Sequence, residues 1–356
     1  PPAAWRGRGF PPPPGPPPGP GGARHTDATI AAIARGMGER YQVVPEDRGA
    51  MVFPFTHIGG ITWLLTGLMF GSASILVEAF DPATTVGVLA AEGVTLAGAG
   101  TPFHMAYLAA QRADPDRPLF PDVRAFPGGG APKPKGLHEA VKREVGGVGI
   151  LSGYGLTEAP ILTLVAVDDP DDKKADTEGR PMPGVDLRIV TLDGRVAGPG
   201  EEGEIRAKAP QLMKGYLDAE LDAEAFDGDG YFRSGDLGVQ DADGYVTITG
   251  RLKDIIIRKG ENISAKEVED LLFTHPNVAD VAVIGLPDPA SGERACAVVV
   301  LNDPAQGLTE NEVREYLTGE GLMIQKVPEQ LELVDVLPRN PTGKVLKHQL
   351  KETFGE

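Results

Sequence analysis

Short apolar runs alternate with longer amphipathic segments over the first half of the chain. The runs are rich in Val, Ile, Leu and Ala and predict buried strands, while the segments between them predict helices. The expected strands are 50–55, 74–78, 94–99, 123–126 and 148–152, and the expected helices are 61–70, 84–92, 103–112 and 135–145. This order predicts an α/β fold with crossover units on a mostly parallel, layered sheet. Ligands bind at the carboxyl ends of such strands, where the loops 126–130 and 152–155 lie.

The pattern changes after residue 180. Short strands at 185–190, 204–207, 230–232 and 244–249, with turns at Asp193-Gly194 and Asp243-Gly244, predict a small antiparallel barrel or sheet.

A third pattern begins near residue 252. It has strands at 254–258, 278–286, 295–301 and 330–334 and helices at 264–273 and 309–318. Ser264 followed by Glu267 predicts a capping box at the start of the first of these helices. A small α+β domain fits this order.

The first 22 residues stand apart, because ten of them are Pro and six are Gly. Such a stretch cannot build a core and is expected to be disordered or polyproline II. Docking to an SH3-like domain is an alternative, but the stretch has no basic flank to fix an orientation. The expected domains are therefore 1–22, 23–250 and a C-terminal lid at 251–356 with a hinge near Lys253.

The net charge and the cysteine content limit which partners and which cellular compartment are expected. A net charge of −17 argues against a nucleic-acid partner or an anionic lipid surface. The one cysteine, Cys296, lies in an apolar run and predicts a buried thiol in a reducing, cytoplasmic compartment. Residues 51–77 contain no Asp, Glu, Lys or Arg, but Pro54 and several glycines divide them into short pieces. We expect a buried core here and no transmembrane segment.

The segment Gly153-Tyr154-Gly155-Leu156-Thr157-Glu158 follows a predicted strand. Its glycines allow the backbone to approach a phosphate, a Thr hydroxyl can bond a phosphate oxygen, and a Glu can hold Mg²⁺. Taken alone, the segment is equally consistent with a tight turn that carries a surface Glu.

Three later segments carry weaker signals. Asp236 follows an aromatic strand and could take both ribose hydroxyls, although a simple turn is the favoured interpretation. Arg251 could bond ribose or phosphate, and Lys253 lies where one domain gives way to the next. Lys344 lies on a Pro/Gly loop that could present a cation to a distant site, but many C-terminal tails have a similar sequence.

Together and in this order, the segments 153–158, 235–236, 250–254 and 340–344 resemble the core signatures of the acyl-adenylate-forming superfamily. This superfamily includes acyl-CoA synthetases, luciferases and peptide-synthetase adenylation domains. The resemblance covers roughly residues 23–356.

The resemblance implies that the large domain binds ATP and Mg²⁺. The segment Gly128-Gly129-Gly130-Ala131-Pro132 resembles the loop beside the adenine, and Tyr154 would stack on the adenine ring. Gly155 belongs to the same nucleotide-binding loop. Thr157 would contact the α-phosphate, and Glu158 would bind the Mg²⁺ ion.

The resemblance also implies roles nearer the C-terminus. Asp236 and Arg251 would hold the ribose, and Lys253 falls at the hinge position. Gly260 lies in the segment that lines the pantetheine tunnel of CoA. Lys344 matches the lysine that bridges the carboxylate and the α-phosphate during adenylation.

His57 matches the family's histidine beside the acyl pocket, although a lone His near an apolar strand is usually a core residue. Thr101-Pro102 matches another segment that lines the acyl site. The other histidines show no metal-ligand spacing, so no zinc site is expected.

The implied activity is ATP-dependent ligation of a carboxylic acid to CoA, with release of AMP and pyrophosphate, in fatty acid and lipid metabolism. The candidate pocket wall is apolar and small, which favours a fatty or alicyclic acid, with an aryl acid next. A peptide-synthetase adenylation domain is less favoured, because no carrier domain follows and the form Gly155-Leu156-Thr157-Glu158 looks like an acyl-CoA ligase.

One departure from the family supports an alternative. The phosphate loop, rich in Ser, Thr and Gly, is expected just before residue 23, but residues 11–22 contain no Ser, Thr or Lys. Adenylation is then expected to be weak, and an open sheet edge is expected to need an oligomer or a partner chain. The alternative function is a catalytically impaired fragment that only binds nucleotide, CoA or a partner.

Overall fold

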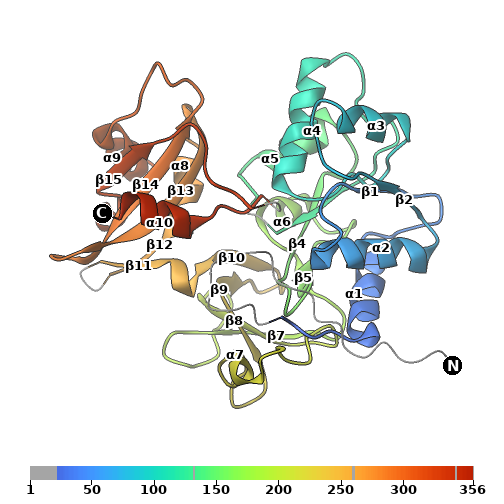
Figure 1. Ribbon diagram of the computed structural model, residues 1–356, viewed down its shortest axis with the longest axis horizontal. Helices are drawn as coiled ribbons and strands as arrows, with labels where there is room; N and C mark the ends of the chain where they lie inside the picture. Colours follow the sequence, from blue (N-terminus) through green and yellow to red (C-terminus); the bar gives the residue numbers. More distant parts are fainter. Residues whose placement is uncertain (1–21, 131–132, 259–260, 341–342, 356) are drawn as a thin grey trace. The chain divides into compact units, whose positions relative to one another are not determined.

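The computed structural model describes residues 22–130, 133–258, 261–340 and 343–355 (Figure 1). The prediction for the Pro/Gly-rich start therefore lies outside the described residues. The chain divides into two compact units, each treated below by itself. The first comprises Pro1–Ser234 with Val239–Thr247, and the second comprises Gly235–Gly238 with Ile248–Glu356.

Parallel strands form the centre of the first unit. β1 (Arg48–Met51) pairs parallel with β2 (Ala73–Leu76), and β3 (Phe126–Gly129) pairs parallel with β4 (Ile150–Tyr154). The strand predicted at 94–99 appears only as isolated parallel bridges, which join Leu96 to Gly49 and to Ala125. The predicted crossover units on a parallel sheet are confirmed.

Successive side chains of a strand point to opposite faces of the sheet, so these strands contribute to one hydrophobic core on each face. Ala97, Phe126 and Ile150 enter the core that also contains Tyr107. Their neighbours Leu96, Ala125 and Leu151 enter the opposite core with Ile33 and Trp63.

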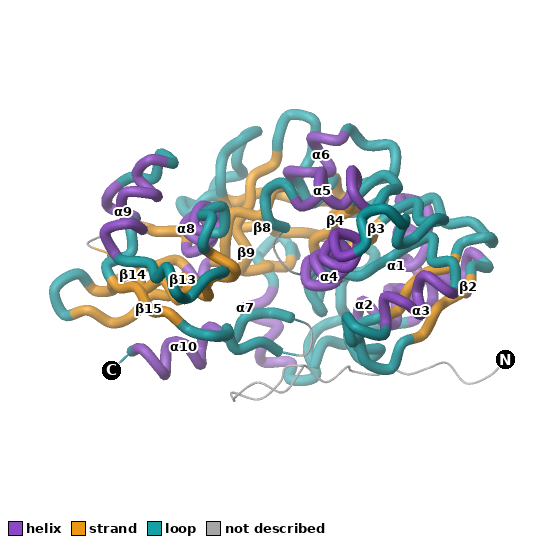
Figure 2. Tube along the Cα trace, turned by 90° about the horizontal axis from the view of Figure 1, so that it is seen from above, coloured by secondary structure: helices purple, strands orange, loops and turns teal. Residues whose placement is uncertain are grey.

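Helices cover both faces. On one side α4 and α5 lie against β3 and β4 (Figure 2). On the other, α1 packs on α2. The helices of this unit are α1 (Asp27–Arg40), α2 (Ile58–Phe70), α3 (Thr85–Ala91), α4 (Thr101–Ala113), α5 (Leu137–Glu144), α6 (Asp171–Asp176) and α7 (Asp222–Ala225), with a 3-10 turn η1 (Ala219–Leu221).

Antiparallel strands extend the first unit. β4 pairs antiparallel with β5 (Thr163–Leu164), which in turn pairs antiparallel with β6 (Arg180–Pro181). A further sheet has the order β10-β9-β8-β7, of which residues 235–238 in β9 and 248–251 in β10 count with the second unit. Its strands are β7 (Asp186–Val190), β8 (Gly203–Lys208), β9 (Phe232–Gln240) and β10 (Val246–Arg251). The small antiparallel sheet predicted for this region is therefore present.

The second unit is an α+β domain around a five-stranded sheet of order β12-β11-β14-β13, with β15 paired to β14. Ser264 caps α8 by accepting a hydrogen bond from the backbone N–H of Glu267, which confirms the predicted N-cap. The Glu267 carboxylate accepts hydrogen bonds from Lys326 Nζ, so the reciprocal half of the predicted capping box is not confirmed. Cys296 lies fully buried on β14, and burial raises the pKa of its thiol to about 12. The elements are η2 (Leu252–Asp254), β11 (Ile255–Arg258), β12 (Glu261–Ser264), α8 (Ala265–Leu272), β13 (Val278–Asp288), β14 (Gly292–Leu301), α9 (Glu310–Gly319), η3 (Ile324–Lys326), β15 (Gln330–Leu333) and α10 (Lys347–Phe354).

Within the described residues, every helix is too short or too polar to cross a bilayer.

Candidate active site

Two glycine-containing loops meet where the parallel strands β3 and β4 end. The register pairs Gly128 with Ser152 and Gly129 with Gly153. The backbones are so close that a Cβ added to Gly129 would lie 2.6 Å from the carbonyl oxygen of Gly153. The structure thus brings the predicted glycine loop beside the segment that carries buried Tyr154. Ala131 and Pro132 lie outside the described residues.

The chain turns sharply after Tyr154. Leu156 and Ala159 exchange backbone hydrogen bonds of 3.2 Å, which closes a tight turn. Gly155 is needed for this turn, because an added Cβ would lie 2.2 Å from the backbone nitrogen of Ile161. Thr157 and Glu158, the residues between, are half-buried at the carboxyl end of the sheet.

Two residues outside the predicted site hold this turn. The Nε2 of buried His25 lies 2.8 Å from the carbonyl oxygen of Thr157 and is placed to donate to it. Burial lowers the pKa of His25, so its imidazole is neutral near pH 7. The hydroxyl of Tyr216 donates to Oε1 of Glu158 at 3.0 Å. Burial, together with the charge of Glu158, raises the pKa of Tyr216 and keeps its hydroxyl a donor.

The hydrophobic periodicity of the sequence does not identify either residue as part of the site. His25 precedes the helix cap Thr26, and Tyr216 lies in a loop far along the chain. Only the fold, which pairs Ala23 with Tyr216 through an isolated bridge, places both beside the turn.

The oxygen atoms of this turn fit a magnesium ion. Mg²⁺ prefers hard oxygen ligands and is commonly bound through one or two carboxylates together with substrate phosphates. Glu158 offers a carboxylate whose orientation is set by Tyr216, next to the hydroxyl of Thr157. These residues would hold the ion, and its charge would offset that of a bound triphosphate.

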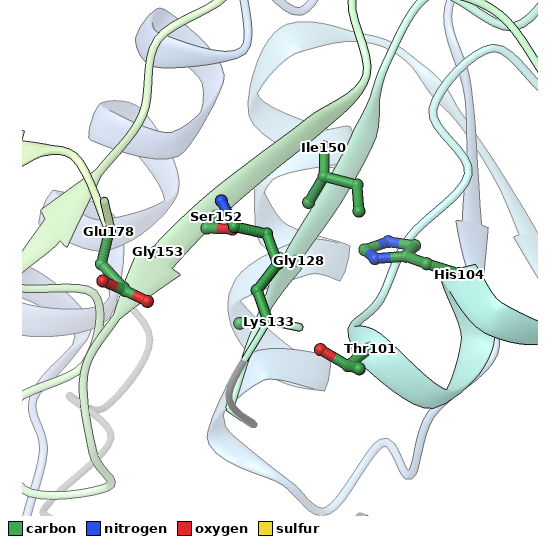
Figure 3. A pocket seen from close by; sticks show the side chains of 9 residues that line it. Thr101, His104, Gly128, Lys133, Ile150, Ser152, Gly153 and Glu178 are labelled. Atoms are coloured by element: carbon green, nitrogen blue, oxygen red, sulfur yellow. The ribbon is translucent and has the colours of Figure 1, made fainter. Parts of the chain in front are cut away.

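A small cavity of about 20 Å³ opens beside the glycine loops (Figure 3). In the close view, Thr101 and His104 of α4 face the strand that carries Ile150 and Ser152. The imidazole of His104 lies 3.1 Å from the Pro127 carbonyl oxygen, and burial lowers the pKa of this histidine to about 4. The lining residues are Thr101, His104, Gly128, Gly129, Lys133, Ile150, Ser152, Gly153 and Glu178.

His57 is the N-cap of α2, where its Nδ1 accepts a hydrogen bond of 3.1 Å from the backbone N–H of Gly59. This capping contact explains its local conformation. Its role beside the acyl pocket stays a prediction.

The remaining predicted residues belong to the second unit. Arg251 Nε donates to Asp236 Oδ1 at 2.6 Å, which joins the two predicted ribose ligands in one ion pair around a buried carboxylate. Lys253 is exposed in η2. Lys344 is exposed, and its backbone N–H donates to Asn340 Oδ1 at 3.0 Å. Gly260 lies outside the described residues.

Comparison with protein families agrees with this geometry. Residues 20–217 match the model of the AMP-binding enzyme, and residues 267–344 match that of the AMP-binding enzyme C-terminal domain.

Curated relatives include acid–CoA ligases. The medium-chain fatty-acid–CoA ligase of Escherichia coli K12 is 34% identical over 93% of this chain, which spans 58% of the relative. A ligase of Rhodococcus jostii RHA1 that joins an octahydro-indenyl propanoyl group to CoA is 36% identical over 90% of this chain and 60% of the relative. The chain thus spans about three fifths of the length of these curated relatives.

Solved structures show the same fold. ATP-bound MatB from Rhodopseudomonas palustris aligns with a TM-score of 0.87 at 30% identity, over 95% of this chain and 66% of that chain. The o-succinylbenzoate CoA synthetase MenE of Bacillus subtilis, in complex with its acyl-adenylate intermediate, aligns with a TM-score of 0.81 at 29% identity, over 94% of this chain and 66% of that chain. The family matches and these relatives show that the chain belongs to the AMP-binding enzyme family, within the acyl-adenylate-forming superfamily.

Proposed function

We propose that the protein ligates a carboxylic acid to CoA through an acyl-adenylate, consuming ATP and releasing AMP and pyrophosphate. The observation that carries this proposal is the convergence of the β3 glycine loop and the Thr157–Glu158 turn at one edge of the parallel sheet. The relatives named above support CoA as the second substrate, and their structures contain ATP or an acyl-adenylate.

In the first step a carboxylate oxygen attacks the α-phosphorus of ATP. The new bond is acyl oxygen to phosphorus, and the bond from that phosphorus to the β-bridging oxygen breaks, so pyrophosphate leaves. Two anions must approach each other, so the protein contributes mainly positioning and electrostatic stabilisation. Thr157 would bond the α-phosphate, and Glu158 would bind Mg²⁺, which neutralises phosphate charge when bound.

Asp236, Arg251 and Lys344 would also take part in the reaction. The ion pair with Arg251 orients the Asp236 carboxylate, which would accept hydrogen bonds from the ribose hydroxyls. Lys344 would neutralise the charge that develops between the carboxylate and the α-phosphate.

In the second step the CoA thiol attacks the acyl carbon, and AMP leaves with the bonding electrons of the acyl–oxygen bond. The thiol proton is lost to solvent or to a base. Rotation about Lys253, at the start of the C-terminal domain, would withdraw Lys344 and admit the pantetheine arm along the segment of Gly260.

The test separates the two steps by a substitution at Lys344. Acid-dependent ATP–pyrophosphate exchange is expected to fall by about 100-fold in Lys344→Ala, because one preorganised charge at the reacting phosphate is lost. Thioester formation from supplied acyl-adenylate is expected to be unchanged. Lys351→Ala, at an exposed lysine of α10, is the matched control.

Residues 11–22 contain no Ser, Thr or Lys, so wild-type exchange is expected to be slow. Nucleotide binding without exchange or thioester formation, with any acid, would contradict the proposal.

A further inference from the structure

The cavity at the ends of β3 and β4 carries a pair of opposite charges. Lys133 precedes α5, and Glu178 precedes β6, so two segments distant in sequence bring the charges to one site (Figure 3). Hydroxyls of Thr101 and Ser152 also line the cavity, and Ile150 is its main apolar residue. A cavity that would hold only the end of an alkyl chain has no need of these groups.

The ammonium group of Lys133 is held within the protein. Its Nζ donates to the backbone carbonyl of Lys174. Burial lowers the pKa of Lys133, while the carboxylates of Glu178, Asp176 and Glu139 act in the opposite direction. The nearby carboxylates favour the charged form of this lysine, whereas its burial disfavours that form.

The lining combines one basic and one acidic side chain, Lys133 and Glu178. Burial lowers the pKa of the third titratable group, His104, to about 4, so its imidazole is neutral near pH 7. A second carboxylate on the substrate would meet Glu178, and its repulsion would offset the attraction of Lys133. A neutral group that both donates and accepts hydrogen bonds matches both charges at once.

The volume sets the size of that group. About 20 Å³ is the space of roughly one water molecule. A hydroxyl fits this space and can both donate and accept hydrogen bonds, whereas a methyl group can do neither beside Lys133 and Glu178. Toward Gly128 there is no spare room, because a Cβ there would lie 2.7 Å from His104 Cε1.

On these grounds, and resting on the proposed function, we propose that the acid substrate bears a neutral hydroxyl group that binds in the cavity lined by Lys133 and Glu178. Its hydroxyl would donate to the Glu178 carboxylate and accept from the Lys133 ammonium. The body of the acid can still be aliphatic, alicyclic or aromatic, since the proposal concerns only the group that enters the cavity.

The test compares matched acids that differ by one hydroxyl. The pairs are hydroxybenzoates with benzoate, hydroxycyclohexanecarboxylates with the parent acid, and ω-hydroxyoctanoate with octanoate, and succinate and adipate test a second carboxylate. Acid-dependent adenylate formation by the wild-type chain is expected to favour one hydroxy acid over its parent by at least about 10-fold in kcat/KM. A parent acid or a dicarboxylate preferred over every hydroxy acid would overturn the inference.

Substitution of the two charges provides the second arm. Lys133→Met and Glu178→Gln are expected to lose the preference, mainly through a higher KM for the hydroxy acid. Lys135→Met, at an exposed lysine two positions along, is expected to retain it. Lys133→Gln keeps a donor in the cavity and covers the case in which Lys133→Met fails to fold. A preference that survives in folded Lys133 and Glu178 variants would also overturn the inference.

A binding readout keeps this result separate from the proposed activity. Saturation-transfer NMR of the same acid pairs requires no turnover. Selective binding of a hydroxy acid, lost in Lys133→Met, supports the cavity assignment even if no acid is adenylated. Adenylation of acids without any hydroxyl preference would support the proposed function and refute the cavity assignment.

Discussion

At the scale of single residues, the turn that would meet the phosphates depends on two hydrogen bonds from outside it. His25 binds the carbonyl of Thr157, and Tyr216 binds the carboxylate of Glu158. Neither side chain is expected to react. Both fix the positions of atoms that would, and small displacements of such atoms reduce rates strongly.

Tyr216→Phe tests this positioning. Loss of the hydroxyl releases Glu158 Oε1, so we expect about 10-fold slower adenylate formation and a shift of the Mg²⁺ dependence to higher concentration. The Mg²⁺ titration matters because a merely structural role would not move it. Tyr231→Phe is the control, because its hydroxyl also donates to a carboxylate, that of Asp186, away from the turn. Equal Mg²⁺ curves for Tyr216→Phe and wild type would contradict the positioning role.

His104 predicts a pH dependence of stability. Its pKa is lowered by burial from 6.5 to about 4, so below pH 6.5 the unfolded chain binds a proton that the folded chain does not. Folding is therefore favoured above pH 6.5, and up to about 3 kcal/mol is lost as the pH falls toward 4.

His104→Gln, which keeps a donor for the Pro127 carbonyl, should remove this contribution. Urea unfolding between pH 6.5 and 4 tests this: the free energy of unfolding should fall less with decreasing pH in the variant than in the wild type. Parallel curves for the variant and wild type would show that His104 is protonated without cost in the folded state.

The sequence singled out the glycines at 128–129 and the segment 153–158, and the structure brings these together at the ends of β3 and β4. The roles of their residues rest on the family resemblance and stay predictions. His25, Tyr216 and the Lys133–Glu178 pair could not be predicted, since they become neighbours of the site only through tertiary contacts. The Asp236–Arg251 ion pair joins the two residues that the family resemblance assigns to the ribose.

At the scale of elements, the turn after β4 is the most constrained feature of the candidate site. Gly155→Ala would force its Cβ to within 2.2 Å of the Ile161 nitrogen, and neither atom can move without opening the turn. We expect a loss of roughly 1–3 kcal/mol in the free energy of unfolding, as for overpacking, together with loss of adenylation.

Gly87→Ala is the matched control for that substitution. Gly87 lies in α3, and nothing lies within 4 Å of an added Cβ. Helix propensity then predicts a gain of up to about 1 kcal/mol with unchanged activity. Chemical denaturation of both variants checks the pair, and a Gly155→Ala variant as stable and active as wild type would contradict the proposed strain.

Elements with a strong hydrophobic period were predicted within a few residues, as α2 and β13 show. α1 was not predicted, and its sequence contains Gly36 and Gly38, which weaken the helix signal. β9 runs from Phe232 to Gln240, beyond the predicted 230–232, because Arg233, Gly235 and Asp236 interrupt its apolar pattern. The strand at 94–99 is reduced to bridges, because Gly98 lies near its end and Gly100 follows it, and glycine weakens strand pairing.

At the scale of the whole molecule, the order in which the hydrophobic patterns follow one another along the chain predicted the architecture. Parallel crossover units, an antiparallel sheet and an α+β unit follow one another as expected, because each class of element has its own period. The chemistry of the site that would bind the acid was harder to predict from the sequence. The apolar residues of the sequence suggested an apolar ligand, whereas the charged side chains of Lys133 and Glu178 line one cavity only in the folded chain.

The burial of Cys296 has a practical consequence for studying the two units. It is the only cysteine of the chain, it lies fully buried in β14, and its raised pKa leaves almost no thiolate near neutrality. Maleimide dyes and spin labels react with exposed thiolates, so the native chain should remain unlabelled without any cysteine replacement. A pair of engineered surface cysteines, one in each unit, would then carry both probes of a distance measurement, and the change of that distance along the reaction could be followed directly.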